Sequence, residues 1–144
     1  MARVQVLILL TAFAITALPG CQPLEGGAVE VSWQFRTPAG SVLDCRDLGI
    51  REVRLEATPK EPLPAGTALR EYRFDCRRDV GQTEFSFPPG RYTLTVEPLC
   101  GTGATATAAP GASVPAPIER ELVAGQLVQL NALLILVPDA LACP

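Results

Sequence analysis

Apolar and polar residues alternate over residues 29–36 (VEVSWQFR). Successive side chains of an extended chain point to opposite faces, so a period of two buries one face of a strand and exposes the other. The alternation returns over residues 50–57, 68–76 and 91–97, and turns rich in proline and glycine separate the runs. The sequence therefore predicts several short strands joined by turns.

One of these runs also fits a helix. Glu52 and Glu56 are four residues apart, which is the spacing of neighbours on one helix face. Gly49 and Pro59 flank the run closely, however, and both residue types interrupt regular structure. A strand is therefore favoured over residues 50–57. Its expected inward side chains are Val53, Leu55 and Ala57.

The last third of the chain is less regular. Residues 101–117 have low complexity and no charge, so we expect a disordered loop there. Residues 118–123 and 126–137 bracket Gly125 like a hairpin. The apolar run at 127–137 is too short to span a bilayer. It fits a core strand buried on both faces, or a strand with a bulge.

Six or seven short strands without a convincing amphipathic helix predict an all-β fold, a small antiparallel β-sandwich. Between the clear strands we expect turns at 37–40 and 79–82, a loop or single helical turn at 41–48, and a surface loop at 59–66. The aromatic side chains at inward positions are expected to fill the core rather than to form a binding platform. They are Trp33, Tyr72, Phe85, Phe87 and Tyr92, and Phe85 and Phe87 are expected to form a short strand of their own.

Composition argues against several chemistries. The chain has no histidine and one lysine, Lys60, so the usual general base, a Ser-His-Asp relay and most zinc sites are unavailable. None of the 15 acidic residues belongs to a recognisable paired motif. The net charge of −3 offers no basic excess to nucleic acid. We therefore expect no enzyme activity, no cofactor, no metal and no nucleic-acid partner.

The N-terminus resembles the signal peptide of bacterial lipoproteins. Arg3 precedes a long uncharged run, and Leu18, Gly20 and Cys21 match the lipobox of that family, although Pro19 replaces its usual alanine or serine. The resemblance implies cleavage between Gly20 and Cys21, and acylation of Cys21 with a diacylglycerol and a fatty acid such as palmitate. Several acyl chains together anchor a protein firmly on a membrane. The alternative is an ordinary secretory signal with a cysteine near its end by chance.

Cleavage at this point would divide the chain into a signal peptide (1–20), a tether (21–27) and one sandwich domain (28–144). The mature chain would have 124 of the 144 residues, and the loss of Arg3 would leave 11 basic and 15 acidic side chains, a charge of −4. Gln22 follows the cysteine, where the lipoprotein sorting rule places an aspartate for retention at the inner membrane. An outer-membrane location in the cell envelope is therefore favoured.

A second resemblance concerns residues 86–96 (SFPPGRYTLTV). They are similar to the penultimate hairpin of prealbumin-like sandwiches, which include carboxypeptidase regulatory-like domains and the B-type repeats of bacterial collagen adhesins. A glycine permits the tight corner before the strand. The wider arrangement also resembles small uncharacterised lipoproteins of myxobacteria. The resemblance implies a prealbumin-like or immunoglobulin-like sandwich, and the matching positions are Pro89, Gly90, Tyr92, Leu94 and Val96.

Four cysteines beyond the lipobox predict two disulfides, because an exported small domain lies in an oxidising compartment and gains from covalent links. Four cysteines allow three pairings. We favour Cys45 with Cys76, which joins the entrance of one strand to the end of its neighbour. The remaining two cysteines, Cys100 and Cys143, would then form the second disulfide and bring the C-terminus back across the loop at 101–117. A redox pair is disfavoured, since the chain contains no CxxC motif.

These features favour a membrane-anchored envelope lipoprotein that acts as a non-catalytic accessory or protein-interaction module. The alternative is a surface module that binds glycan or peptidoglycan through end loops, with Asp44, Asp47, Arg77 and Arg78 as the candidate binding residues. Solvated turn charges are the simpler interpretation of those four residues. The best clue to a third class, an enzyme, would be a calcium-like site formed by Asp44, Asp47 and Asp75.

Overall fold

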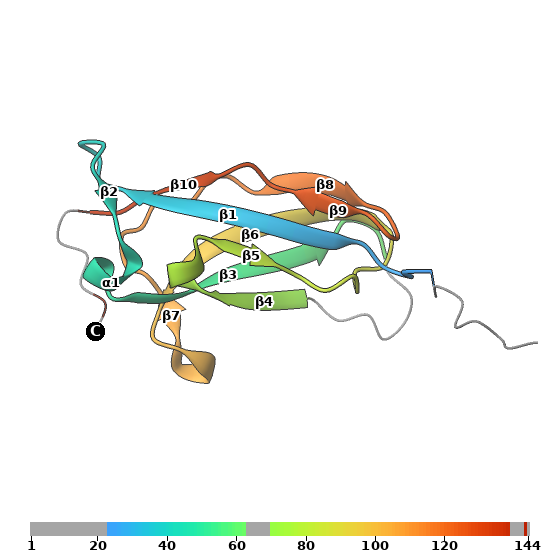
Figure 1. Cartoon of the computed structure of the whole chain (residues 1–144), viewed down its shortest axis with the longest axis horizontal. Coiled ribbons are helices and arrows are strands. Elements are labelled where there is room, and N and C mark those ends of the chain that lie inside the picture. The colour runs from blue at the N-terminus through green and yellow to red at the C-terminus, as the bar shows by residue number, and fades with distance from the viewer. Residues whose placement is uncertain (1–22, 63–69, 139–142, 144) are drawn as a thin grey trace, which may run out of the picture.

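The computed structural model describes residues 23–62, 70–138 and 143. Two β-sheets pack face to face in this part of the chain (Figure 1), and two disulfides link it, which confirms the predicted all-β sandwich. The expected signal peptide, Cys21, and parts of the expected loop at 59–66 and strand at 68–76 lie outside the described residues. The predictions made for those positions remain predictions.

The first sheet is built around β1, which pairs with all four of its other strands. Strands β2 and β5 run antiparallel to β1, whereas β9 and β10 run parallel to it. The sheet is therefore mixed rather than wholly antiparallel. Its strands are β1 (Ala28–Arg36), β2 (Val42–Leu43), β5 (Val80–Gln82), β9 (Leu127–Gln129) and β10 (Leu133–Leu136).

The second sheet is antiparallel and has β3 and β6 at its centre, with nine register pairs between Ile50–Cys100 and Pro59–Tyr92. Short helices lie between the strands: α1 (Cys45–Leu48), and two single turns, η1 (Cys76–Arg78) and η2 (Gly103–Thr105). The strands of this sheet are β3 (Ile50–Pro59), β4 (Arg70–Asp75), β6 (Gly90–Cys100), β7 (Thr107–Ala108) and β8 (Ile118–Leu122).

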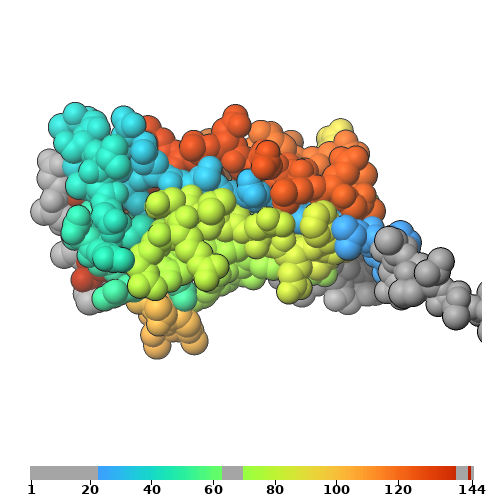
Figure 2. Space-filling view, viewed as in Figure 1, coloured from blue at the N-terminus to red at the C-terminus, as the bar shows by residue number. Residues whose placement is uncertain are grey.

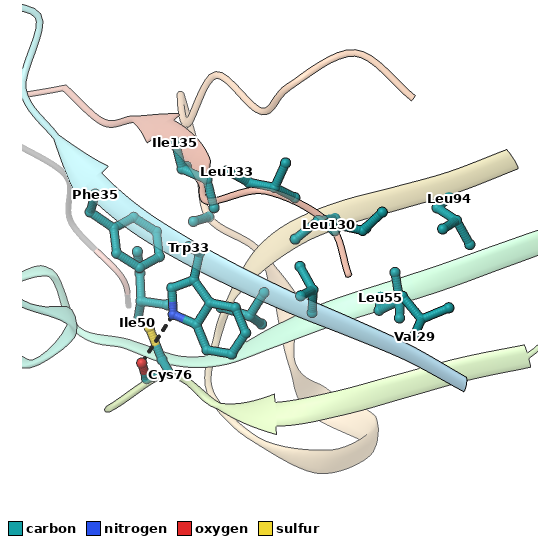
Figure 3. Packing of buried hydrophobic residues seen from close by; sticks show 14 of the residues in the cluster. Val29, Trp33, Phe35, Ile50, Leu55, Cys76, Leu94, Leu130, Leu133 and Ile135 are labelled. Atoms are coloured by element: carbon teal, nitrogen blue, oxygen red, sulfur yellow. Dashed lines mark hydrogen bonds between the residues drawn. The ribbon is translucent and has the colours of Figure 1, made fainter. Parts of the chain in front are cut away.

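The core forms where the inward faces of the alternating strands meet, as expected. Trp33 is only 3% exposed, and its indole Nε1 donates a hydrogen bond of 3.1 Å to the backbone carbonyl of Cys76 (Figure 3). This bond ties the middle of β1 to the first residue of η1, directly after β4, so it links the two sheets. The predicted inward residues of β3 and β6 are buried as well: Val53, Leu55, Ala57, Tyr92, Leu94 and Val96.

The proline-glycine corner before β6 is fastened by its tyrosine. Gly90 has a φ of +151°, which favours glycine. The Tyr92 hydroxyl donates a hydrogen bond of 2.9 Å to the carbonyl of Pro88, while its ring packs edge-on against Phe87 at 5.6 Å between centroids. Burial raises the pKa of the Tyr92 hydroxyl. One side chain therefore holds the corner and fills the core.

Both disulfides form as predicted. Cys45 at the start of α1 bonds to Cys76 at the start of η1, with a Cα–Cα distance of 6.0 Å. Cys100 at the end of β6 bonds to Cys143, with a Cα–Cα distance of 5.3 Å. The first pair joins the two connecting segments that precede β3 and follow β4. The second fixes a residue near the C-terminus to the central strand of the second sheet.

Two predictions for the middle of the chain are wrong. The turn at 79–82 is confined to Asp79, which has a φ of 56°, and the next three residues form β5. A strand of three residues with Gly81 at its centre is too short to show alternation. Phe85 and Phe87 do not form a regular strand either; Phe87 makes an isolated bridge with Gly27. Phe87 is nonetheless fully buried, as predicted.

The hairpin predicted around Gly125 is also wrong. Strand β8 pairs with β6 in the second sheet, whereas β9 pairs with β1 in the first, so the turn at Gly125 carries the chain from one sheet to the other. The apolar run after it breaks into β9 and β10, and it is buried on one face only. Leu133 and Ile135 are 8% and 0% exposed, whereas Leu134 is 47% exposed.

Residues 101–117, expected to be a disordered loop, contain η2 and β7. Strand β7 pairs with the end of β6, and Ala109 is buried. Ser113 exchanges two backbone hydrogen bonds with Leu136 at the edge of β10. The segment lacks large side chains, and it is held instead by backbone pairing to both sheets, which composition does not reveal.

Candidate functional site

Two open hollows lie at the end of the sandwich that carries α1 and η1. They have volumes of about 430 and 480 Å³. The disulfide between Cys45 and Cys76 connects α1 to η1, and the indole of Trp33 holds η1 through the carbonyl of Cys76. The walls of both hollows are therefore fixed by a covalent bond and a buried hydrogen bond.

The first hollow is lined by charges of both signs. Arg77 binds the carboxylate of Asp75 through Nη2 at 2.5 Å and Nε at 3.0 Å, and its backbone N–H donates to the same carboxylate. These hydrogen bonds hold the pKa of Asp75 well below its usual range and raise the pKa of Arg77. The hollow is also lined by Arg46, Arg51 and Glu52.

Glu52 differs from the other charged residues of this hollow because part of its carboxylate is buried. Its Oε2 atom makes no hydrogen bond within the described residues, although Arg73 Nη1 lies 3.5 Å away as an ion-pair partner. Arg73 is held more tightly by Glu71, with 2.6 Å from Nε to Oε1, and this hydrogen bond raises the pKa of Arg73. The charges beside the hollow thus pair mainly with one another.

The second hollow is acidic. Asp44, Asp47 and Asp79 line it, and Trp33 and Phe35 lie beneath. The carboxylate of Asp44 accepts a hydrogen bond of 2.8 Å from the backbone N–H of Arg46, which caps the start of α1. Both aromatic rings belong to residues that are at most 3% exposed, so they offer no stacking surface.

The structure separates the predicted site residues into two groups. Asp44 and Asp47 line the acidic hollow, whereas Arg77 lines the mixed-charge hollow, and Arg78 lines neither. Asp75, expected beside Asp44 and Asp47 in a calcium-like site, pairs with Arg77 in the other hollow. In the described ranges no three histidine, cysteine or acidic side chains are grouped to hold a metal ion.

Arg46, Arg51 and Glu52 line the first hollow but were not predicted to belong to a site. They lie in alternating or helical stretches, where a charge normally marks a solvent-facing position. Strand pairing places Glu52 of β3 opposite Asp75 of β4, and the disulfide between Cys45 and Cys76 brings α1, which carries Arg46, beside the same segment. The pairing of Cys45 with Cys76 was the signal in the sequence that could have found Arg46, and the alternation of β3 and β4 was the signal for Glu52.

The outer faces of the two sheets differ in charge. The six ion pairs among the described residues all lie on the second sheet or the segments next to it. Arg54 of β3, for example, binds Glu97 of β6 and lies 3.8 Å from Glu71 of β4. Lys60 binds Glu119 at 2.5 Å, which lowers the pKa of Glu119.

The outer face of the first sheet, here called the β1 face, is mostly uncharged. Only Glu30 and Arg36 are charged among the outward positions of its strands, and each makes a hydrogen bond with a glutamine side chain. Cross-strand register places the apolar side chains beside the outward positions of β1. They are Val42 (58% exposed), Val80 (43%), Leu134 (47%) and Leu136 (38%).

Comparisons with protein families, with curated proteins and with solved structures found no match for this chain. The resemblances to lipoproteins and to prealbumin-like sandwiches therefore remain predictions from the sequence. No helix within the described ranges is long and apolar enough to cross a membrane.

Proposed function

We propose that this protein is an envelope lipoprotein, anchored through acyl chains on Cys21 and located at the outer membrane, whose sandwich acts as a non-catalytic interaction module. The lipobox supports the anchor. The two disulfides support an oxidising compartment beyond the cytoplasm. The lack of histidine and the local pairing of the end-loop charges support a binding role over catalysis.

The observation that carries the interaction role is the contrast between the two outer faces. Four large apolar side chains are exposed on the β1 face, while the opposite face is covered by ion pairs. They lie on both sides of the outward polar residues of β1, opposite Ser32, Gln34 and Arg36, and apolar side chains gathered on one exposed face are typical of protein-binding surfaces. An envelope protein with a similarly uncharged surface is the partner that this face fits.

A matched pair of arginine substitutions tests the role. Leu134→Arg adds a charge at an outward position of the β1 face, and Thr93→Arg adds the same charge at an outward position of β6. We expect the wild type and Thr93→Arg to recover the same protein from envelope extracts, and Leu134→Arg to lose it. Recovery of no protein above background, or of the same protein by all three forms, would contradict the proposal.

A glycan or peptidoglycan module has weaker support. The acidic hollow has carboxylates that could accept hydrogen bonds from sugar hydroxyls, but the rings of Trp33 and Phe35 beneath it are covered. Stacking on a sugar ring would require one of them to be exposed. We therefore place the interaction role on the β1 face rather than on the hollows.

A further inference from the structure

The N-terminal segment is part of the sandwich from Gly26 onward. The backbone N–H of Gly125 donates to the carbonyl of Gly26 at 2.9 Å. Gly27 and Phe87 exchange two backbone hydrogen bonds, of 2.9 and 3.1 Å. A Cβ atom on Gly26 would lie 2.7 Å from the carbonyl oxygen of Phe85, so the chain here approaches its neighbours too closely for a side chain. Little chain is left for a tether.

Covalent geometry then limits how far the sandwich can stand from an anchor at Cys21. Gly26 lies five residues after Cys21, and an extended chain spans at most about 3.6 Å per residue, so the limit is about 18 Å. For Leu24 the corresponding limit is about 11 Å. The end of the sandwich from which this segment leaves must therefore lie close to the lipid.

That end of the sandwich exposes apolar side chains on one turn and on the N-terminal segment, next to the charged residues Lys60, Glu61 and Arg91 at the neighbouring ends of β3 and β6. Leu24 is 52% exposed, Val123 39% and Leu127 36%. Val123 and Leu127 flank the turn from β8 to β9, and the seven residues 122–128 (LVAGQLV) carry no charge. The turn lies beside the departing N-terminal segment at one end of the molecule (Figures 1 and 2). The opposite end holds α1 and the charged hollows.

We propose that this turn, together with Leu24, rests on the phospholipid surface, so that the sandwich stands end-on upon the membrane. The proposal relies on the proposed anchor at Cys21. The contact is apolar rather than electrostatic. The nearest charges on the two segments, Glu25 and Glu121, are acidic, and Arg91 of β6 lies opposite Glu121 in register, so this end has no basic excess that would attract anionic headgroups. The occupant is therefore the interfacial layer of a zwitterionic bilayer.

An end-on orientation determines how every other surface of the sandwich is directed relative to the membrane. Strand β1 has nine residues, which at about 3.3 Å per residue gives about 30 Å from its start to its end. The two hollows would then lie about 30 Å above the lipid, and the β1 face would point sideways, parallel to the membrane. A partner bound to that face would stand beside this protein on the same surface.

Tryptophan quenching by brominated phospholipid tests the orientation. The lipidated mature protein, which begins at Cys21, is reconstituted into phosphatidylcholine vesicles with bromine near the headgroup end of the acyl chains. Val123→Trp places a reporter in the turn, and Val42→Trp places one at the opposite end, where the side chain is 58% exposed. Native Trp33 is buried and is common to both proteins. Leu24→Trp provides a second reporter at the membrane end, outside the strands.

We expect at least twofold quenching of the added tryptophan at positions 123 and 24, and none at position 42. Equal quenching at both ends, or none at either, in protein that floats with the vesicles would overturn the end-on orientation while leaving the anchor intact. Failure of the wild type to float would overturn the anchor and this proposal with it. Replacing a third of the phosphatidylcholine by phosphatidylglycerol should not increase the quenching; an increase would show an electrostatic contact instead.

Discussion

Substituting alanine for Gly81 tests how the two sheets pack against each other. A Cβ atom at this position of β5 would lie 2.2 Å from Cγ of Phe74 in β4, whereas ordinary van der Waals contact begins at 3.4 Å. The ring must therefore move by about 1.2 Å, the difference between those two distances, or the strands must separate. The Phe74 ring stacks against Trp33 with 6.2 Å between centroids, so its displacement would reach the core.

The expected cost follows from overpacking. Inserting a methyl group into a filled site costs about 1–3 kcal/mol, and we expect about 2–3 kcal/mol for Gly81→Ala because both β4 and Trp33 resist the shift. In a Phe74→Ala background the obstacle is gone, and the same substitution should be neutral or stabilise the strand by about 0.5 kcal/mol. The coupling energy between the two positions should therefore be about 2–3 kcal/mol.

The four proteins to compare are the parent, Gly81→Ala, Phe74→Ala and the double variant, all in a Cys21→Ser background. Their urea unfolding, followed by circular dichroism, gives this coupling energy. Gly125→Ala is the control, because Gly125 has a φ of +74° and no atom lies within 4 Å of the place that an added methyl group would take. Its cost of about 1–2 kcal/mol arises from the left-handed backbone and should be the same with either residue at position 74. If Gly81→Ala cost the same in both Phe74 backgrounds, the packing argument would be refuted.

Three further results are expected. Trp33→Phe should lower the free energy of unfolding by about 1–3 kcal/mol, because the carbonyl of Cys76 loses a buried hydrogen bond; urea unfolding measures the loss, and no change would contradict the role of this bond. Replacing Cys45 and Cys76 together by serine should cost about 4 kcal/mol, since the bridge closes a separation of 31 residues; an unchanged unfolding midpoint would argue against it. The carboxyl of Asp75 should titrate well below pH 4 in the wild type and return toward about 4 in Arg77→Ala, as NMR titration can show. Because the folded-state pKa is lowered, the stability that this pair contributes is present above about pH 4 and is lost as the pH falls toward the lowered value.

Long alternating strands were predictable from the sequence because their periodicity reports burial directly. β1, β3 and β6 each show a buried residue at every second position along most of their length. The pairing of Cys45 with Cys76 could be predicted for a related reason, since Cys76 directly follows β4 and Cys45 lies in the short helix that leads into β3. Local pattern and short-range topology were sufficient there.

The crossing at Gly125 could not be predicted in this way. A turn between two apolar runs has the same sequence signals whether the chain folds back in one sheet or moves to the other. The choice depends on the edge of β1 that remains open for β9 and β10, which is a property of the assembled sandwich. For the same reason, β5 could not be recognised from the sequence, and only its pairing with β1 in the structure identifies it as a strand.

The candidate site was predicted in part. Asp44 and Asp47 do lie together in the acidic hollow, because both belong to the turn around α1. Asp75 instead binds Arg77, two residues further along, within a local Asp-Cys-Arg turn. It therefore does not join Asp44 and Asp47 in the expected calcium-like site. The apolar β1 face was missed because its exposed members come from segments that are distant in the sequence.

Metabolic labelling with a radioactive or alkyne-tagged palmitate tests the central claim, the lipid anchor, most directly. The wild type and Cys21→Ser are expressed in parallel, and their disulfides are checked under non-reducing conditions so that loss of label cannot be attributed to misfolding. We expect label in the wild type and none in Cys21→Ser. Equal label in both proteins, or no label in either, would contradict the account of a sandwich held on the membrane through Cys21.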